Sequence, residues 1–149
     1  MEITDHFTLE ELTWSYTAQR LGIRNTPDAV ALHNLVGLAT LLEGVRALCG
    51  HRPVHVSSGY RSPALNQAVN GAAESAHIDG RAGDFRIPGF GTPREVAERV
   101  ILSDLPFDKV ILEAESWIHI QTRDNPRRLA FVATFETGRP TYRAWEGAP

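Results

Sequence analysis

A histidine and an aspartate lie seven positions apart in SAHIDGRAGDFRI, residues 75–87. His77 and Asp84 would occupy opposite faces of a straight strand, because side chains alternate along a strand. Gly80 can turn the chain between them, so that Asp84 enters the next strand and points back at the histidine. Gly83 leaves room beside the carboxylate. Imidazole and carboxylate are both zinc ligands, so the pair is a candidate metal site; the alternative is a turn histidine beside a solvated acid.

A second histidine with unusual surroundings lies in WIHIQT, residues 117–122. In a strand, His119 shares one face with Trp117 and Gln121. A histidine that is flanked by isoleucines and faces the core is partly desolvated, and its polar ring then needs a partner. A metal ion would supply that partner.

Two imidazoles and one carboxylate favour a catalytic zinc site over a structural one. Three protein ligands that leave the fourth position open are typical of catalytic zinc, whereas structural sites usually close with cysteines. The chain has one cysteine, Cys49, which excludes both a cysteine-closed site and an internal disulfide. The His-Glu-x-x-His helix of many zinc proteases is also absent from the sequence.

Two capping patterns predict short helices. Thr8 is followed three residues later by Glu11, a pairing that can form a capping box and begin a helix of about two turns. Residues 92–103 begin with Thr92 and Pro93, an N-cap residue followed by a proline in the first helical position.

A long helix over residues 26–50 is the clearest predicted element. Thr26 can cap it, Pro27 occupies the first helical position, and Gly50 follows its end. Apolar residues recur at three- and four-residue steps, as on one buried helical face. This face consists of Val30, Leu32, Leu35, Leu38, Leu41, Leu42, Val45 and Leu48.

Alternating apolar residues predict the strands of a small sheet. The predicted strands are residues 53–58, 82–87, 109–114, 117–122, 129–135 and 141–145, and a glycine turn at 59–60 opens into a short helix. The last four strands form two successive hairpins, which predict an antiparallel sheet. The predicted fold class is α+β: a single domain, residues 1–149, with a small central antiparallel sheet covered by helices and the metal site at the sheet.

The second hairpin, around ETGRP, carries four aromatic residues. Phe131, Phe135, Tyr142 and Trp145 are expected to pack rather than to bind a ligand.

Composition excludes several classes of partner. The formal net charge is −3, and the one local basic stretch, RDNPRR at 123–128, reads as a loop, so no nucleic-acid partner is expected. No apolar run approaches the roughly 20 residues that span a bilayer, so no membrane insertion is expected. The acidic N-terminus lacks the basic start and apolar stretch of a secretory signal. We therefore expect synthesis in the cytoplasm without a signal peptide.

Three sequence blocks resemble a known enzyme family. SGYRSPALNQAV at 58–69, SAHIDGRAGDF at 75–85 and FDKVILEAESWIHI at 107–120 are similar to the motifs of the zinc D-Ala-D-Ala carboxypeptidase family of peptidoglycan peptidases. The similar branch includes small phage endolysins and prophage-encoded cell-wall peptidases. The resemblance covers residues 6–122, and its core is Ser-x-His-x-x-Gly-x-Ala-x-Asp followed downstream by Trp-x-His. Gly83 stands where many members have alanine.

The resemblance assigns roles to five residues. It implies that His77, Asp84 and His119 bind one Zn²⁺ per chain. Arg61 matches an arginine that faces the substrate, and its planar guanidinium suits a carboxylate or a polarised carbonyl. Ser75 matches a serine that contacts the substrate. Without the resemblance, Arg61 would read as a surface residue at a helix start and Ser75 as a loop hydroxyl.

The general base is less clearly indicated. Some relatives have an acid three residues before the last histidine ligand, but this chain has Ser116 there. Glu115 would share the face of His119 in a continuous strand. If the chain folds back at 115–117, Glu113 comes opposite His119 instead. We predict Glu113 as the base, with Glu115 as the second candidate.

The resemblance implies a zinc metallopeptidase that hydrolyses the stem peptide of peptidoglycan. The bond could be internal, as in an L-Ala-D-Glu endopeptidase, or terminal, as in a D-Ala-D-Ala carboxypeptidase, and the small domain favours the former. The alternatives are a non-catalytic zinc-binding module that recognises the cell wall and a metal-free interaction domain. A substrate in the cell wall and no export signal together suggest release by a holin-type pore. No oligomeric state is indicated, and a monomer is expected.

Overall fold

A six-stranded mixed sheet organises the protein, whose computed structural model describes residues 1–146. The strand order is β3-β4-β6-β5-β7-β8. The bounds are β3 His55–Ser58, β4 Ala82–Arg86, β5 Lys109–Glu113, β6 Trp117–Gln121, β7 Leu129–Glu136 and β8 Arg139–Ala144. A separate two-stranded sheet joins β1, Glu2–Thr4, to β2, Phe7–Thr8. The α+β class is therefore confirmed.

The sheet departs from the predicted antiparallel arrangement at one pair of strands. β5 and β7 run parallel, while the other four strand pairs are antiparallel. The cause lies in the strand order: β6 pairs with β4 on one side and β5 on the other, so both of its edges are occupied. The chain after β6 must therefore cross to the free edge of β5. The loop that contains residues 123–128 makes this crossing.

Within residues 1–146 the chain forms five helices: α1 Leu9–Thr13, α2 Tyr16–Leu21, α3 Ala29–Leu48, α4 Pro63–Ala68 and α5 Pro93–Ile101. The capping box predicted at Thr8 is present, and Thr92, predicted as an N-cap, also forms one with Glu95. The first helix is shorter than predicted, because the chain leaves it at Trp14 and Ser15 caps a separate helix, α2.

The long helix begins two residues later than predicted. Its N-cap is Asp28, whose carboxylate accepts a hydrogen bond from the backbone N–H of Ala31 at 2.8 Å. Thr26 and Pro27 therefore precede the helix. Val30, predicted on the buried face, is 70% exposed. The buried side chains of α3 are Ala31, Leu35, Leu38, Ala39, Leu41, Leu42 and Val45.

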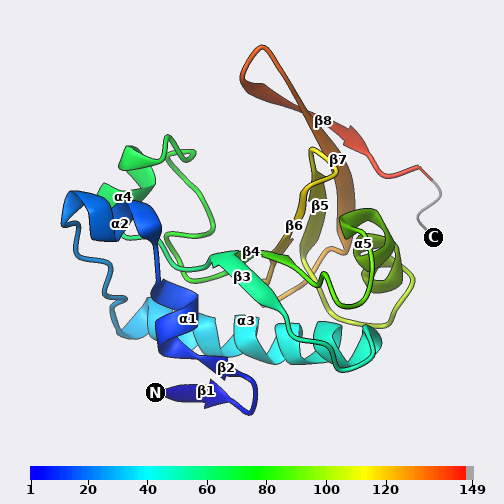
Figure 1. Ribbon diagram of the computed structural model, residues 1–149, viewed down its shortest axis with the longest axis horizontal. Helices are drawn as coiled ribbons and strands as arrows, with labels where there is room; N and C mark the ends of the chain where they lie inside the picture. The colour runs from blue at the N-terminus through cyan, green and yellow to red at the C-terminus, as the bar shows by residue number, and fades with distance from the viewer. Residues whose placement is uncertain (147–149) are drawn as a thin grey trace.

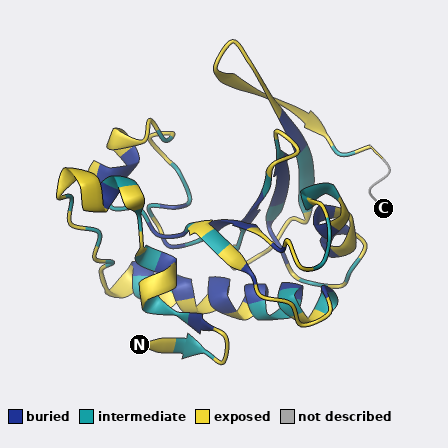
Figure 2. Cartoon of the chain, in the orientation of Figure 1, coloured by how far each residue is buried: buried dark blue, intermediate teal, exposed yellow. Residues whose placement is uncertain are grey.

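The hydrophobic core lies between one face of the sheet and helices α3 and α5 (Figures 1 and 2). The sheet contributes Phe85, Val110, Leu112, Ile118 and Ile120 to this core. Each large apolar side chain that is fully buried stabilises the fold by roughly 1.5–3 kcal/mol. Side chains alternate along each strand, so the intervening residues must point to the opposite face of the sheet. That face carries the candidate site.

Within the described residues, no helix combines the length and the apolar character needed to cross a membrane.

Candidate metal centre and cleft

Strand register brings the first two candidate ligands together. Asp84 on β4 lies directly opposite His119 on β6. Nδ1 of His119 lies 2.9 Å from Oδ1 of Asp84, and both residues are buried. These two residues are 35 positions apart in sequence, so their meeting depends on the pairing of the two strands.

The third candidate ligand, His77, comes from the loop before β4. Gly80 turns this loop with φ of +72°, and a Cβ there would lie 2.4 Å from the backbone oxygen of Ala31 on α3. The predicted glycine turn is therefore present, packed against the long helix. Nε2 of His77 lies 3.4 Å from Oδ2 of Asp84.

A backbone carbonyl fixes the tautomer of His77. Nδ1 of His77 donates a hydrogen bond to the oxygen of Gly59 at 2.7 Å. The proton on Nδ1 leaves Nε2 with a free lone pair, which faces Asp84. Hydrogen bonds of this kind orient metal-binding histidines in proteins.

Gln121 has the same effect on His119, and the sequence patterns did not predict it. Nε2 of His119 lies 2.7 Å from Oε1 of Gln121, which can only accept a hydrogen bond. Nδ1 is thus the nitrogen that faces Asp84. The only hint in the sequence was that Gln121 shares the strand face of His119.

These three side chains form a group that could hold a metal ion. Their ligand atoms all lie within 4.8 Å of one another, and all three residues are buried. Burial raises the pKa of the Asp84 carboxyl, but His119 and His77 donate to it when their facing nitrogens are protonated, and these contacts outweigh burial and hold that pKa well below its usual range. An ionised carboxylate between two imidazoles is a donor set that suits a divalent zinc ion.

Arg61 contacts the same carboxylate from the other side. Its Nη2 lies 3.6 Å from Oδ2 of Asp84, its Nε donates to Ser58 at 3.1 Å, and its Nη1 donates to Asn66 at 3.3 Å. Burial lowers the pKa of Arg61, whereas the charges of Asp84 and Glu113 raise it. The side chain is 18% exposed and lies at the wall of a cleft.

Ser75 also lines this cleft, in the loop before His77. Its hydroxyl accepts a hydrogen bond from the backbone N–H of His77 at 3.2 Å. The contact ties Ser75 to the candidate ligand His77 and leaves the hydroxyl proton free to be donated.

The two candidate bases lie in different environments. Glu113 ends β5 and lines the cleft, where burial and the negative charge of Asp84 raise its pKa, against the lowering effects of His119 and Arg61. In register it lies opposite Trp117 rather than His119, because the turn spans only residues 114–116. It therefore faces His119 diagonally across the strand pair.

Glu115 is not brought to the site. Arg94 on α5 binds its carboxylate through two hydrogen bonds, of 2.9 and 2.6 Å, and these lower its pKa. Its side chain is 55% exposed. The continuous strand that would have aligned it with His119 does not form, because Ala114 and Glu115 both adopt left-handed backbone angles in a tight turn.

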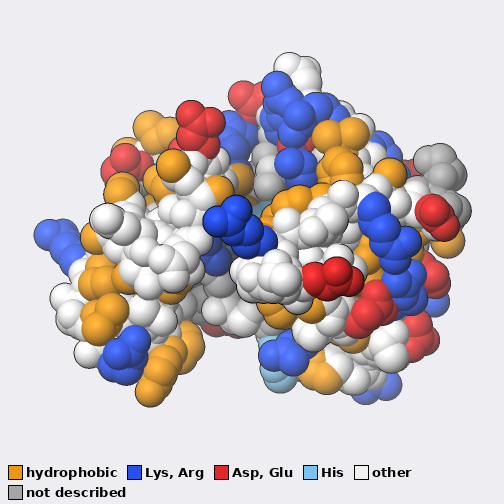
Figure 3. All heavy atoms as spheres, turned by 90° about the horizontal axis from the view of Figure 1, so that it is seen from above, with side chains coloured by type: hydrophobic (Ala, Val, Ile, Leu, Met, Phe, Trp, Pro, Cys, Tyr) orange, Lys and Arg blue, Asp and Glu red, His pale blue; other side chains and the backbone are white. Residues whose placement is uncertain are grey.

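The cleft has a volume of about 970 Å³. Figure 3 views it from above as a hollow, with Lys and Arg side chains along its edges. One side is the loop at residues 69–77, and the other is the exposed face of β5, β6, β7 and β8. This face also includes Lys109, Ile111 and Pro140, which the sequence analysis did not predict as site residues.

Three of the four aromatic residues of the last hairpin line the cleft, and that they pack rather than bind a ligand stays a prediction. Phe131, Phe135 and Tyr142 face it, whereas Trp145 packs against the core. The reason is the register across β5, β7 and β8, which aligns these residues with the face of Glu113. Alternation along residues 131–135 was a signal, but the parallel pairing that decides their neighbours was not predicted.

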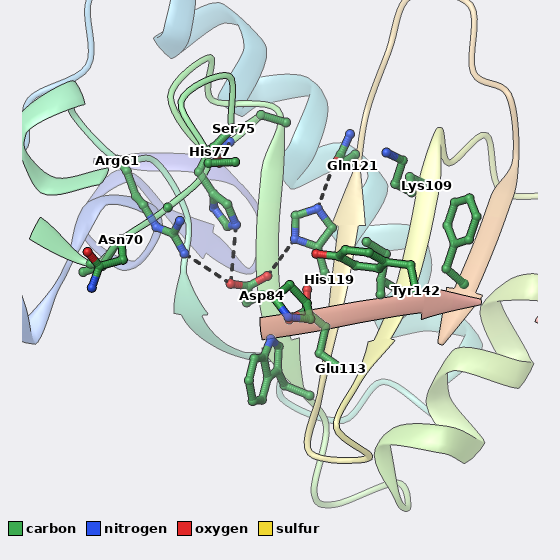
Figure 4. A pocket seen from close by; sticks show the side chains of 18 of the residues that line it. Arg61, Asn70, Ser75, His77, Asp84, Lys109, Glu113, His119, Gln121 and Tyr142 are labelled. Carbon is green, nitrogen blue, oxygen red and sulfur yellow. Dashed lines mark hydrogen bonds and ion pairs between the residues drawn. The ribbon is translucent and has the colours of Figure 1, made fainter. Parts of the chain in front are cut away.

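Figure 4 shows the resulting arrangement. Arg61 and His77 approach Asp84 from one side, and His119 approaches it from the other. Glu113 and Tyr142 lie at the same end of the group. Trp117 also lines the cleft, and its buried indole N–H has no hydrogen-bond partner among the described residues.

Comparison with known proteins identifies a family. The family model described as peptidase M15 matches residues 5–121, which include every residue that lines the candidate site except those of the last hairpin. Among curated proteins, no match was found. The match covers most of the chain, and it includes the three residues whose ligand atoms converge on one point. The chain therefore belongs to the peptidase M15 family, of the zinc D-Ala-D-Ala carboxypeptidase type.

Proposed function

We propose that the protein is a zinc peptidase that hydrolyses a peptide bond in the stem peptide of peptidoglycan. The observation that carries the proposal is the convergence of His77, Asp84 and His119 within 4.8 Å, in a cleft that also contains Glu113. The described residues carry all of these groups, so they act together as one catalytic domain.

Zinc held by these three side chains would lower the pKa of a coordinated water to about 7 and would polarise the scissile carbonyl. Glu113 takes the proton from the attacking water and then delivers it to the departing amine. The raised pKa of Glu113 suits both steps, because a carboxylate with a lower pKa would accept the proton of the water less readily. Glu115 is excluded from this role by its ion pair with Arg94.

Arg61 and Ser75 position the substrate in this proposal. Each terminal nitrogen of Arg61 keeps a further N–H beyond those directed at Asn66 and Asp84. These can donate to a substrate carbonyl or carboxylate on the cleft side. The hydroxyl of Ser75 can donate to a backbone carbonyl of the same peptide.

An internal bond is the favoured point of cleavage. A cleft of about 970 Å³ has room for several residues of an extended peptide, as an L-Ala-D-Glu endopeptidase requires. A D-Ala-D-Ala carboxypeptidase would instead hold a terminal carboxylate beside a cation, and Arg61 and Lys109 are the cations that line the cleft.

The test is digestion of purified peptidoglycan by zinc-loaded protein, with the released fragments identified by mass spectrometry. The masses of the new ends show which bond is cut. Glu113→Gln should lower the rate by about 10²–10⁴-fold, the usual contribution of a general base. Its zinc content should equal that of wild type.

Glu115→Gln is the matched control, since it makes the same chemical change two residues away on the surface. Its rate should stay within about twofold of wild type, as is usual for surface substitutions. Release of no fragments by folded, zinc-loaded wild type would overturn the peptidase proposal and favour a binding module. Equal losses in the two variants would overturn the role of Glu113.

A further inference from the structure

The last hairpin supplies a wall of the cleft that lies outside the matched family region. This hairpin, formed by β7 and β8, begins at Leu129, whereas the family match ends at residue 121. Groups that it brings to the candidate metal centre are therefore additions of this chain to the matched region. Tyr142 is the one residue of the hairpin that both lines the cleft and carries a polar group at the end of its side chain.

Strand register aligns Tyr142 with Glu113. Ala133 on β7 pairs with Glu113 on one side and with Tyr142 on the other, so the three side chains share one face in a row. Adjacent strands are about 4.8 Å apart, so the backbones of Tyr142 and Glu113 are separated by roughly 10 Å. The methyl group of Ala133 is small enough for the tyrosine ring to lie over it and extend toward β5 and β6.

The hydroxyl of Tyr142 points toward the candidate ligands. In Figure 4 its oxygen is directed at the region between His119, Asp84 and Glu113. The negative charges of Glu113 and Asp84 both act on the pKa of this phenol, after burial, and all three raise it. No hydrogen bond of the Tyr142 hydroxyl is present within residues 1–146.

Of the donors beside Asp84, Arg61 already contacts protein groups, although its terminal nitrogens keep further N–H groups for a substrate. All three guanidinium nitrogens of Arg61 contact Ser58, Asn66 or Asp84. A neutral phenol without a partner keeps its proton at pH 7 and can donate it to a bound molecule. Tyr142 is 53% exposed, so a substrate in the cleft would cover its ring.

We infer that Tyr142 is a further catalytic residue, whose hydroxyl donates a hydrogen bond to the carbonyl oxygen of the scissile bond as that oxygen gains negative charge. The inference rests on the proposed peptidase function. Donors that are aimed at a developing oxyanion strengthen in the transition state and so act on kcat rather than on KM. No bond to Tyr142 forms or breaks.

The test compares Tyr142→Phe with wild type on a synthetic stem peptide. Removal of one donor to an oxyanion typically lowers kcat by about 10²–10³-fold, and we expect this loss with KM within about twofold. Tyr16→Phe is the matched control, because Tyr16 is 67% exposed on α2 and does not line the cleft. It should behave as wild type.

A second readout does not depend on turnover. A peptide with a phosphinate in place of the scissile bond imitates the tetrahedral transition state. Tyr142→Phe should weaken binding of this analogue by about the same 10²–10³-fold factor. Affinity for the uncleaved peptide, measured in the Glu113→Gln background, should not change.

Two negative results have different meanings. An active wild type with unchanged kcat and analogue affinity in Tyr142→Phe would overturn the role of Tyr142 and leave the peptidase proposal intact. A zinc-loaded wild type that neither hydrolyses the peptide nor binds the phosphinate would overturn the peptidase proposal and, with it, this role.

Discussion

Two buried aspartates in this protein have opposite surroundings. Asp108 is 1% exposed and Asp84 is 8% exposed. Arg127 binds Asp108 through both carboxylate oxygens, at 2.9 and 2.8 Å, and donates its backbone N–H as well, at 3.1 Å. Asp84 has two imidazoles, at 2.9 and 3.4 Å, and a guanidinium nitrogen at 3.6 Å.

The difference separates a carboxylate with a structural partner from the proposed metal ligand. A guanidinium is a permanent cation, and a bidentate pair with it occupies both oxygens of the carboxylate. Imidazoles are different, because a neutral ring offers a lone pair to a metal ion and the ring titrates near neutral pH. Burial alone therefore does not mark the site; the chemistry of the partners and access to the cleft do.

The largest expected effect is the loss of catalysis when Asp84, rather than Asp108, is substituted. Asp84→Asn replaces an anionic ligand by a neutral amide, so we expect peptidoglycan hydrolysis to fall below detection, as the nucleophile reverts toward ordinary water with a pKa of about 15.7. Asp108→Asn should retain activity at a temperature where it is folded. Fragment release from purified peptidoglycan measures both. Hydrolysis by the Asp84 variant at the wild-type rate would contradict the assignment.

A smaller effect is expected on stabilisation by zinc. A ligand that binds only the folded state adds about 2.7 kcal/mol to the free energy of unfolding at a concentration 100 times its Kd. Zinc should therefore raise the thermal midpoint of wild type and of Asp108→Asn, and leave that of Asp84→Asn unchanged. Thermal unfolding with zinc and with a chelator provides the measurement. Equal shifts in all three proteins would show that zinc binds elsewhere.

A further, smaller effect is expected on stability when the ion pair between Asp108 and Arg127 is lost. Asp108→Asn leaves the donors of Arg127 poorly satisfied, and we expect a decrease of about 1–3 kcal/mol in the free energy of unfolding at pH 7. Urea unfolding in the presence of a chelator isolates this effect from metal binding. An unchanged midpoint would mean that solvent replaces Arg127 at no cost.

The same pair predicts a pH dependence with a definite sign. Hydrogen bonds from Arg127 hold the pKa of Asp108 below its usual value, which is about 3.9 in an unfolded chain. Its stabilisation is therefore complete above that value and is lost as the pH falls through the lower folded pKa. The stability difference between wild type and Asp108→Asn should be constant from pH 5 to 7 and shrink at more acidic pH. A difference that grows under acid would have the wrong sign.

The smallest effect concerns the strand that carries Asp84. A Cβ on Gly83 would lie 3.5 Å from Cδ2 of Leu38, an ordinary contact. Gly83→Ala should be tolerated and raise the free energy of unfolding by about 0.4–1 kcal/mol, because it restricts the unfolded chain. Gly80→Ala is the control and should destabilise, since Gly80 has a left-handed backbone and no room for a methyl group. A loss in Gly83→Ala would reveal tighter packing at β4.

Local features of the fold could be predicted from the sequence, and long-range pairings could not. The capping boxes at Thr8 and Thr92 involve residues three apart, so the pattern contains all the information. The N-cap predicted at Thr26 was wrong, because Asp28 caps the helix instead. The parallel pairing of β5 with β7 depends on which sheet edge remains free, a property of the whole strand order.

The candidate site shows the same limit. The turn at Gly80 and the placement of Asp84 beside His77 followed from spacing and glycine, and the structure has both. Glu113 was predicted to lie opposite His119, but it pairs with Trp117, because the length of the turn was unknown. Tyr142 could not be predicted to line the cleft, since its position depends on two strand pairings in succession.

Zinc stoichiometry tests the central claim most directly. Purified wild type should contain one zinc ion per chain after metal loading and dialysis, and His119→Ala, compared under the same conditions, should contain none while remaining folded. Such a result would support the His77, Asp84 and His119 centre on which the peptidase proposal depends. A folded, metal-loaded wild type without zinc would contradict it.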